Sequence, residues 1–255
     1  MTDKDILRIA MEQSAVDIGA DAGDFLLNEN VVVPYDPGEG VKSYYNKPIS
    51  CNFISYGNNI VVGAADEIRD IVKDYIDGFI FYHCFETPNI RWLNERIEPF
   101  GQTVCFMAEY YLPDLKLLKE RECEFELKIL NKEDFKDLYK PEWANALCMD
   151  RKELDVLGIG AYDGSELIGF AGCSADAKEM WQIGVDVLPT YRRRGVASAL
   201  TSRLALEILE RDKVPFYCSA WSNIRSARNA VKSGFLPAWA EMTVKDIKKV
   251  DEING

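Results

Sequence analysis

The residues best suited to chemistry lie in one short segment, residues 185–197, which reads Val-Asp-Val-Leu-Pro-Thr-Tyr-Arg-Arg-Arg-Gly-Val-Ala. A strand pattern ends there at a proline, and a helix pattern starts after Gly195. The first turn of a helix presents unpaired backbone N–H groups and the positive end of its dipole, so it binds anions. Small side chains at Gly195 and Ala197 let a diphosphate approach these amides closely. Charged donors for the phosphates come from three consecutive arginines: Arg192, Arg193 and Arg194.

The same segment resembles the acyl-CoA signature of the GNAT superfamily of N-acyltransferases, V-x-P-x-x-[QR]-x-x-G-x-[GA]. The matching residues are Val187, Pro189, Arg192, Gly195 and Ala197. Further along the chain, a second block resembles the N-x-x-[AS] to G-F block of the same family. It consists of Asn223-x-x-Ser226 followed by Ser233-Gly234-Phe235. The resemblance covers residues 125–245.

The resemblance implies the GNAT acyl-CoA N-acyltransferase fold, an α/β fold whose mixed, twisted sheet splits into a V between its fourth and fifth strands. We place this domain at residues 125–250, because the charged segment 116–122 separates two strand patterns just before it. Residues 1–124 are expected to form a smaller α/β domain, for which the sequence indicates no role. That half is similar to the preceding domain in a subset of bacterial two-domain GNAT proteins.

Hydrophobic periodicity predicts the elements that position the motif. Alternating apolar residues indicate strands, and apolar residues three or four positions apart indicate helices. The expected strands are 60–62, 102–111, 125–130, 157–162, 166–175, 181–188, 214–220 and 239–244. The expected helices are 66–76, 89–97, 132–139, 143–148, 194–211 and 224–233. The second half therefore has the order β-α-α-β-β-β-α-β-α-β.

The resemblance also implies acetyl-CoA as the co-substrate. Its diphosphate would be held by the backbone amides of Arg193, Arg194, Gly195, Val196 and Ala197. The side chains of Arg192 and its neighbours would flank the phosphates. The backbone of Val185 and Val187 would pair with the pantetheine arm in the manner of an added strand.

Asn223, in the second block with Ser226, would hydrogen-bond the same pantetheine arm. Its position just before Ile224 also predicts that it caps the following helix, since asparagine is favoured there. Both interpretations of Asn223 stay open. No pair of cysteines and no cluster with the single histidine has metal-ligand spacing, so we expect no metal site.

The catalytic groups depart from the usual pattern of the family. Many members carry a tyrosine midway along the last helix, and Ala230 occupies that position here. Asp186 is the only ionisable residue in the strand 181–188, so it is the candidate base, although it can equally serve structure. A replacement acid would be a protic side chain at the end of the next strand: Tyr217, Cys218 or Ser219.

Three functions compete. The leading hypothesis is an N-acetyltransferase in which the amine of a small molecule attacks the thioester of acetyl-CoA directly, with positioning supplying much of the rate. The alternative is a catalytically inactive acyl-CoA-binding regulatory protein, which the missing tyrosine favours. Acetylation of protein N-termini is less favoured, since the chain has no basic surface for ribosome contact.

The composition limits the partners and the cellular compartment that we expect for this protein. With 30 basic and 42 acidic residues in 255, the net charge is −12, which disfavours binding to nucleic acid or to anionic membranes. No stretch of apolar residues is long enough to predict a membrane span. The seven cysteines are scattered singly, which is typical of free thiols in the cytoplasm. The sequence leaves a homodimer open.

Overall fold

The computed structural model describes residues 1–43 and 49–255. Its helices, with short 3-10 turns labelled η, are α1 (Asp3–Ile18), η1 (Ala22–Leu26), α2 (Arg69–Gly78), η3 (Phe81–His83), α3 (Thr87–Ile97), η4 (Glu98–Phe100), η5 (Lys132–Phe135), η6 (Pro141–Trp143), η7 (Met149–Arg151), η8 (Pro189–Tyr191), α4 (Val196–Leu209), α5 (Ile224–Ser233) and α6 (Ile247–Asn254). Its strands are β1 (Val31–Pro34), β2 (Cys51–Ser55), β3 (Val61–Ala64), β4 (Gln102–Pro113), β5 (Glu126–Asn131), β6 (Asp155–Asp163), β7 (Glu166–Ser174), β8 (Met180–Val187), β9 (Val214–Ser219) and β10 (Phe235–Asp246).

The chain forms two compact units. Unit 1 comprises Met1–Ile9 and Tyr110–Pro237, and unit 2 comprises Ala10–Glu109 and Ala238–Gly255. These units differ from the expected domains, because residues 110–124 belong with the second half and the C-terminal residues from 238 onward belong with the first. The division into independent domains at 1–124 and 125–250 stays a prediction.

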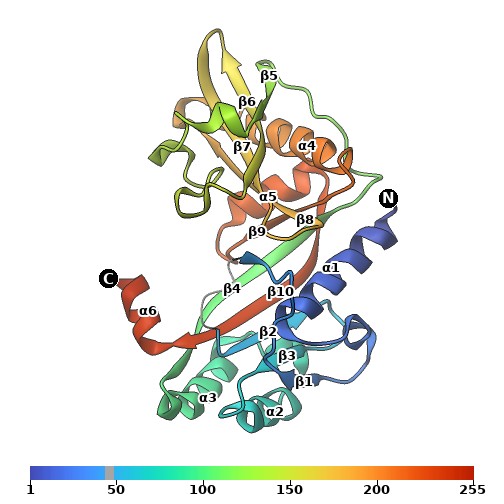
Figure 1. The fold of residues 1–255 in the computed structure, drawn as a ribbon, viewed down its shortest axis with the longest axis vertical. Coiled ribbons are helices and arrows are strands. Elements are labelled where there is room, and N and C mark those ends of the chain that lie inside the picture. The colour runs from blue at the N-terminus through green and yellow to red at the C-terminus, as the bar shows by residue number, and fades with distance from the viewer. Residues whose placement is uncertain (44–48) are drawn as a thin grey trace. The chain divides into compact units, whose positions relative to one another are not determined.

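Unit 1 is built on a mixed sheet with the strand order β9-β8-β7-β6-β5, and the end of β4 from Tyr110 onward lies next to β9. Neighbouring strands from β5 to β8 are antiparallel, whereas β8 and β9 are parallel. Helix α4 packs on β6 to β9 and on α5 (Figure 1), and its apolar stripe, including Leu200, Leu204 and Ile208, is fully buried. The mixed α/β class that we expected is confirmed.

The segment between β5 and β6 differs from the prediction. We expected helices at 132–139 and 143–148, and the structure has only the short turns η5 and η6 there. Pro141 lacks the N–H that would continue a helix. The apolar residues of the segment are instead buried against Phe170 of β7, in a small core formed with Phe135, Trp143, Ala146 and Leu147. Short local turns together with this tertiary packing hold the segment.

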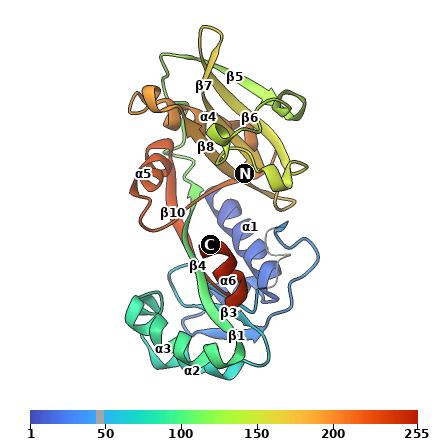
Figure 2. The same ribbon diagram turned by 90° about the vertical axis from the view of Figure 1, so that its left-hand side faces the viewer.

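Unit 2 has strands in the order β1-β3-β2-β10, with β1 and β3 parallel and the other two pairs antiparallel. Helices α2 and α3 contact each other (Figure 2), and both contribute to one apolar core with the strands. Helices α1 and α6 and strands β1 and β2 were not predicted from the sequence. Over the described residues, no helix has the length and apolar character needed to cross a membrane.

Candidate functional site

Strands β8 and β9 of unit 1 separate part-way along their length. They are paired in parallel over four positions, from Met180 opposite Val214 to Ile183 opposite Tyr217. Strand β8 then continues to Val187 and β9 to Ser219, with no further pairs in the described part of the chain. One edge of β8 is therefore open where the two strands diverge, as expected for a V-shaped split.

The backbone of β8 is oriented to use this open edge. The amide of Leu188 donates to the carbonyl of Ile168, so the even-numbered residues of β8 make the hydrogen bonds with β7. In an antiparallel ladder the alternate residues point their N–H and C=O groups the other way. Val185 and Val187 consequently direct their backbone groups away from β7 and toward the opening.

A cavity of about 970 Å³ opens at this divergence. It is formed by β8, β9, the turn before α4, one side of α5 and the segment that follows η6. Its lining residues are Asn145, Gln182 to Val187, Tyr191 to Arg193, Gly195 to Ser198, Tyr217 to Ala220, Asn223, Arg225, Ser226, Arg228, Asn229 and Lys232. All predicted site residues except Arg194 are among them.

The turn before α4 exposes backbone amides to the cavity. Gly195 is the N-cap of α4 with a φ of 83°, and no side chain caps the helix. Arg193 also has a positive φ, 65°. Gly195 suits this left-handed backbone because it has no Cβ, and a Cβ built there would meet open space. The first-turn amides of Val196, Ala197 and Ser198 lie in the part of a helix that has no intrahelical acceptor.

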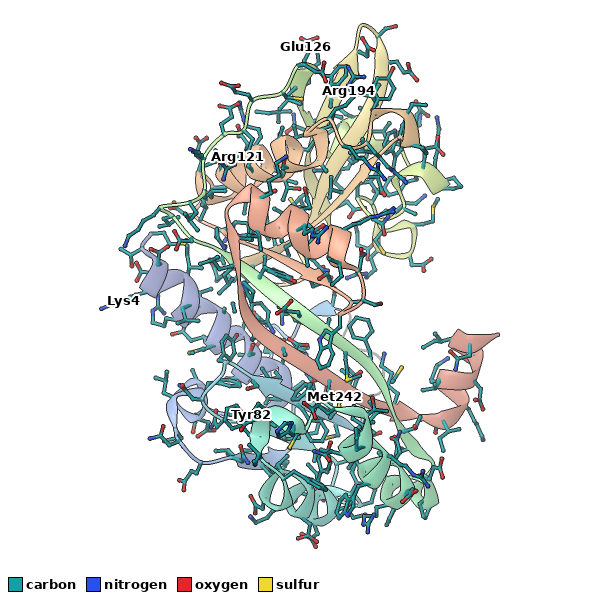
Figure 3. All side chains as sticks on the ribbon, turned by 180° about the vertical axis from the view of Figure 1, so that it is seen from behind. Lys4, Tyr82, Arg121, Glu126, Arg194 and Met242 are labelled. Carbon is teal, nitrogen blue, oxygen red and sulfur yellow. The ribbon has the colours of Figure 1, made fainter. Side chains whose placement is uncertain are left out.

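The three arginines of the motif have different environments. Arg192 lines the cavity and donates from Nε to the carbonyl of Val187 at 2.9 Å, and Arg193 also lines it. Arg194 instead pairs with Glu124 at 2.7 Å and lies over the ring of Phe125. The hydrogen bond from Arg194 lowers the pKa of Glu124. Figure 3 shows Arg194 beside the start of β5. Its side chain is thus separate from the cavity.

Sequence reasoning missed a second basic surface. Arg225, Arg228 and Lys232 line the cavity from α5, and their spacing places them on one side of the helix. No acid in the described residues forms an ion pair with any of the three. Helical periodicity between Asn223 and Gly234 was the signal that could have identified them. Asp186 is the only acid among the cavity residues, so the cavity is cationic although the chain is acidic.

The predicted acid candidates on β9 are held in hydrogen-bonded pairs. The hydroxyl of Tyr217 lies 2.8 Å from the Oγ of Ser226, and the Oγ of Ser219 lies 3.3 Å from the hydroxyl of Tyr111. Burial raises the pKa of Tyr217 above its ordinary value. Burial therefore favours the neutral form of Tyr217, which is one of the residues that line the cavity.

Asp186 is strongly engaged by the chain itself. Its carboxylate accepts hydrogen bonds from the backbone amide of Asn145 at 2.8 Å, the side chain of Asn145 at 2.6 Å and the amide of Ala146 at 3.0 Å. These contacts tie β8 to the segment after η6. Its predicted role as a base stays a prediction.

Asn223 caps α5, as one of the two interpretations predicted. Its Oδ1 accepts from the amide of Ser226 at 3.2 Å, and Asn223 lines the cavity as well. Ala230, which replaces the usual tyrosine, is fully buried in the core of unit 1. In the described part of the chain, no group of three or more His, Cys, Asp or Glu residues is placed to hold a metal ion.

A comparison with protein families identifies the family of this chain. A model described as GNAT acetyltransferase matches residues 96–238, more than half of the chain. The chain belongs to the GNAT acetyltransferase family. The matched residues, 96–238, include all the residues that line the cavity.

Several solved structures match parts of this chain at low sequence identity and low TM-score. A GNAT-family protein from Novosphingobium aromaticivorans is 21% identical over 56% of this chain and 66% of its own, with a TM-score of 0.42. A GCN5-related N-acetyltransferase-like protein from Streptococcus suis is 17% identical over 79% of this chain and 85% of its own, with a TM-score of 0.47. The protein yncA from Salmonella typhimurium, solved with acetyl-CoA, is 14% identical over 49% of this chain and 95% of its own, with a TM-score of 0.35.

The match to the Novosphingobium aromaticivorans structure spans less than two thirds of that chain. A search with the sequence finds no curated protein that matches.

Proposed function

We propose that this GNAT protein transfers an acetyl group from acetyl-CoA to the amine of a small molecule. The observation that supports this most is the cationic cavity at the divergence of β8 and β9, where an uncapped helix start and an open strand edge face the same space. Acetyl-CoA carries both phosphates and a chain of amides, which are the partners that these two surfaces need.

The residues present fit coenzyme A group by group. The amides from Arg193 to Ala197 would bind the diphosphate, with the guanidinium groups of Arg192 and Arg193 beside it. The basic side of α5 would face the remaining phosphate. The open backbone groups of Val185 and the amide of Val187, whose carbonyl already accepts from Arg192, would pair with the pantetheine arm, which would lie near Asn223.

The proposed reaction is direct attack on the thioester. The amine nitrogen forms a bond to the carbonyl carbon, the C–S bond breaks, and the coenzyme A thiolate leaves. The amine loses a proton and the thiolate gains one. Tyr217 would supply the proton to the thiolate, because it lines the cavity, burial favours its protonated form and its hydroxyl lies beside that of Ser226, through which it could be reprotonated. Ser219, paired with Tyr111, is the second candidate for that role.

One observation favours the alternative of an inactive acyl-CoA-binding regulatory protein. The position of the usual tyrosine is occupied by Ala230, whose side chain is buried in the core and does not line the cavity. In this alternative, the cavity would bind acyl-CoA with the same residues but would release no thiol.

A single set of measurements separates these functions. The binding of CoA is measured by calorimetry, and thiol release from acetyl-CoA is measured with ethanolamine, tyramine, spermidine and kanamycin. CoA binding with amine-dependent thiol release supports the transferase. CoA binding without release for any of the four amines supports the regulatory alternative, and the absence of CoA binding overturns both.

The proposed setting is the cytoplasm. All seven cysteines are free thiols and three of them are buried, which suits a reducing compartment. The proposed partner is a small-molecule amine, since an acidic chain is a poor partner for nucleic acid or anionic membranes. The homodimer stays open, and light scattering measures the oligomeric state.

A further inference from the structure

The segment after η6 is clamped onto the face of the sheet that lies away from the α4 and α5 core. Asp186 binds the backbone amides of both Asn145 and Ala146 through one oxygen, Oδ2, at 2.8 and 3.0 Å. Its other oxygen, Oδ1, accepts from the Nδ2 group of Asn145 at 2.6 Å. One carboxylate thereby fixes both the main chain and the side chain of Asn145.

Two glycines allow the segment to approach the strands this closely. A Cβ on Gly184 would lie 1.8 Å from the carbonyl oxygen of Asn145, and one on Gly172 would lie 2.2 Å from that of Ala146. Real Cβ atoms do not approach backbone so closely, so only glycine fits at either position. Ala146 is also buried in the apolar core around Phe170. Asn145 is therefore held in one place at the edge of the cavity that it lines.

The chemistry of the pair fixes which end of the Asn145 amide is left for a ligand. An ionised carboxylate only accepts hydrogen bonds, so the NH₂ group of the amide must face Asp186. The amide oxygen Oδ1 then faces away from Asp186. Because Asn145 is exposed and lines the cavity, this oxygen is available to a donor that enters the cavity.

We propose that Asn145 binds the acceptor substrate by accepting a hydrogen bond from its amine N–H, and that Asp186 is the positioning residue that orients Asn145. This assignment rests on the proposed acetyl transfer. An amide oxygen suits a nucleophilic amine better than a carboxylate does, because a neighbouring negative charge favours the protonated ammonium, which has no lone pair for attack. Asn145 orients the neutral amine without that penalty.

The pairing predicts an unusual effect for Asp186→Asn. The new side chain can still accept the two backbone amides through its oxygen, which leaves its NH₂ group facing Asn145. Two NH₂ groups cannot bond to each other, so the amide of Asn145 turns and presents its own NH₂ group to the cavity. The variant keeps the segment in place, but the amine of the substrate then faces an NH₂ donor instead of an oxygen acceptor.

The test compares the wild type with Asn145→Ala and Asp186→Asn. Asp137→Asn is the control, since it removes an exposed carboxylate outside the cavity. CoA binding is measured by calorimetry. Binding and turnover of ethanolamine, tyramine, spermidine and kanamycin are then measured with CoA-loaded and acetyl-CoA-loaded protein. The acid 3-(4-hydroxyphenyl)propionate, matched in shape to tyramine, serves as the ligand without an amine.

In both variants the affinity and KM for the best amine weaken by about 10- to 100-fold, the range expected when a desolvated N–H loses its partner. CoA affinity changes by less than about twofold and the control behaves as the wild type, because neither change touches the phosphate-binding surfaces. The pH–rate profile of Asp186→Asn keeps the shape of the wild-type profile. Thermal unfolding checks that each variant is folded, and either variant alone suffices for the test.

The outcomes separate this inference from the proposed function. Loss of CoA binding by the wild type overturns both. CoA binding together with unchanged amine affinity in Asn145→Ala, or with no amine bound by the wild type, overturns the assignment of Asn145 alone. Loss of the acidic limb of the pH profile in Asp186→Asn, with KM unchanged, would show that Asp186 is the base and not a positioning residue.

Discussion

The two basic walls of the cavity offer different groups to an anion. The turn before α4 offers backbone amides in a left-handed conformation that Gly195 makes accessible. The wall on α5 offers only the side-chain charges of Arg225, Arg228 and Lys232. Backbone amides contribute through the conformation of the turn, to which Arg192 and Arg193 add charge, whereas a wall made only of exposed charges is screened by salt. Backbone geometry and side-chain charge should therefore contribute separately to coenzyme A affinity, and substitutions can measure each contribution.

The largest effect is expected at the turn before α4. Gly195→Val places a β-branched residue at a φ of 83°, which strains the turn, and its side chain enters the open space beside Gly195. CoA affinity should fall by about 100-fold or more by calorimetry. Gly164→Val is the matched control, because Gly164 also has a positive φ, 62°, with open space around it, and lies outside the cavity. Equal CoA affinity in the two variants would contradict the role of the turn.

The next largest effect is expected at Tyr217, which lines the cavity from β9. Tyr217→Phe removes the proposed proton donor without altering either phosphate-binding surface, so kcat should fall by about 10- to 100-fold while CoA affinity is preserved. The neutral form of Tyr217 persists below its pKa, which burial raises above the ordinary value. The wild-type rate should therefore decline only when the pH rises through that raised pKa, and the variant should lose this alkaline decline. A variant with unchanged kcat would exclude Tyr217 as the acid.

A smaller effect is expected at the charged wall. Arg228→Ala should weaken CoA binding by about fivefold at low salt, and the difference should shrink toward zero as salt screens the charge. Calorimetry with CoA and with dephospho-CoA at two ionic strengths measures this effect. Arg121→Ala removes a charge outside the cavity and serves as the control. A salt-independent loss would mean that Arg228 acts through structure and not through charge.

The smallest effect is expected at Arg194, although it belongs to the sequence motif. Its side chain pairs with Glu124 outside the cavity, so Arg194→Ala should change CoA affinity by less than about twofold. Its backbone amide remains in the turn. A loss comparable to that of Arg228→Ala would show that Arg194 leaves Glu124 and turns toward the ligand.

Local patterns in the sequence determined much of this site. The strand that ends at Val187, the turn through Gly195 and the helices α4 and α5 all depend on periodicity and on residues close together in the chain. The same local information gave a helix cap as one of two interpretations of Asn223, and the family resemblance gave the replacement of a tyrosine by Ala230. Such features are readable because neighbouring residues fix them.

Only the tertiary structure decided the rest. The separation of Arg194 from the cavity depends on Glu124, and the clamp on Asn145 depends on Asp186, each a partner far away in the sequence. Residues 132–148 form only short turns, and the apolar side chains of Phe135, Trp143, Ala146 and Leu147 pack with Phe170, a partner that local periodicity does not reveal. Contacts between distant residues leave no periodic pattern in the sequence. The sequence alone therefore determined the turn before α4, whereas only the tertiary structure determined which side chains surround it.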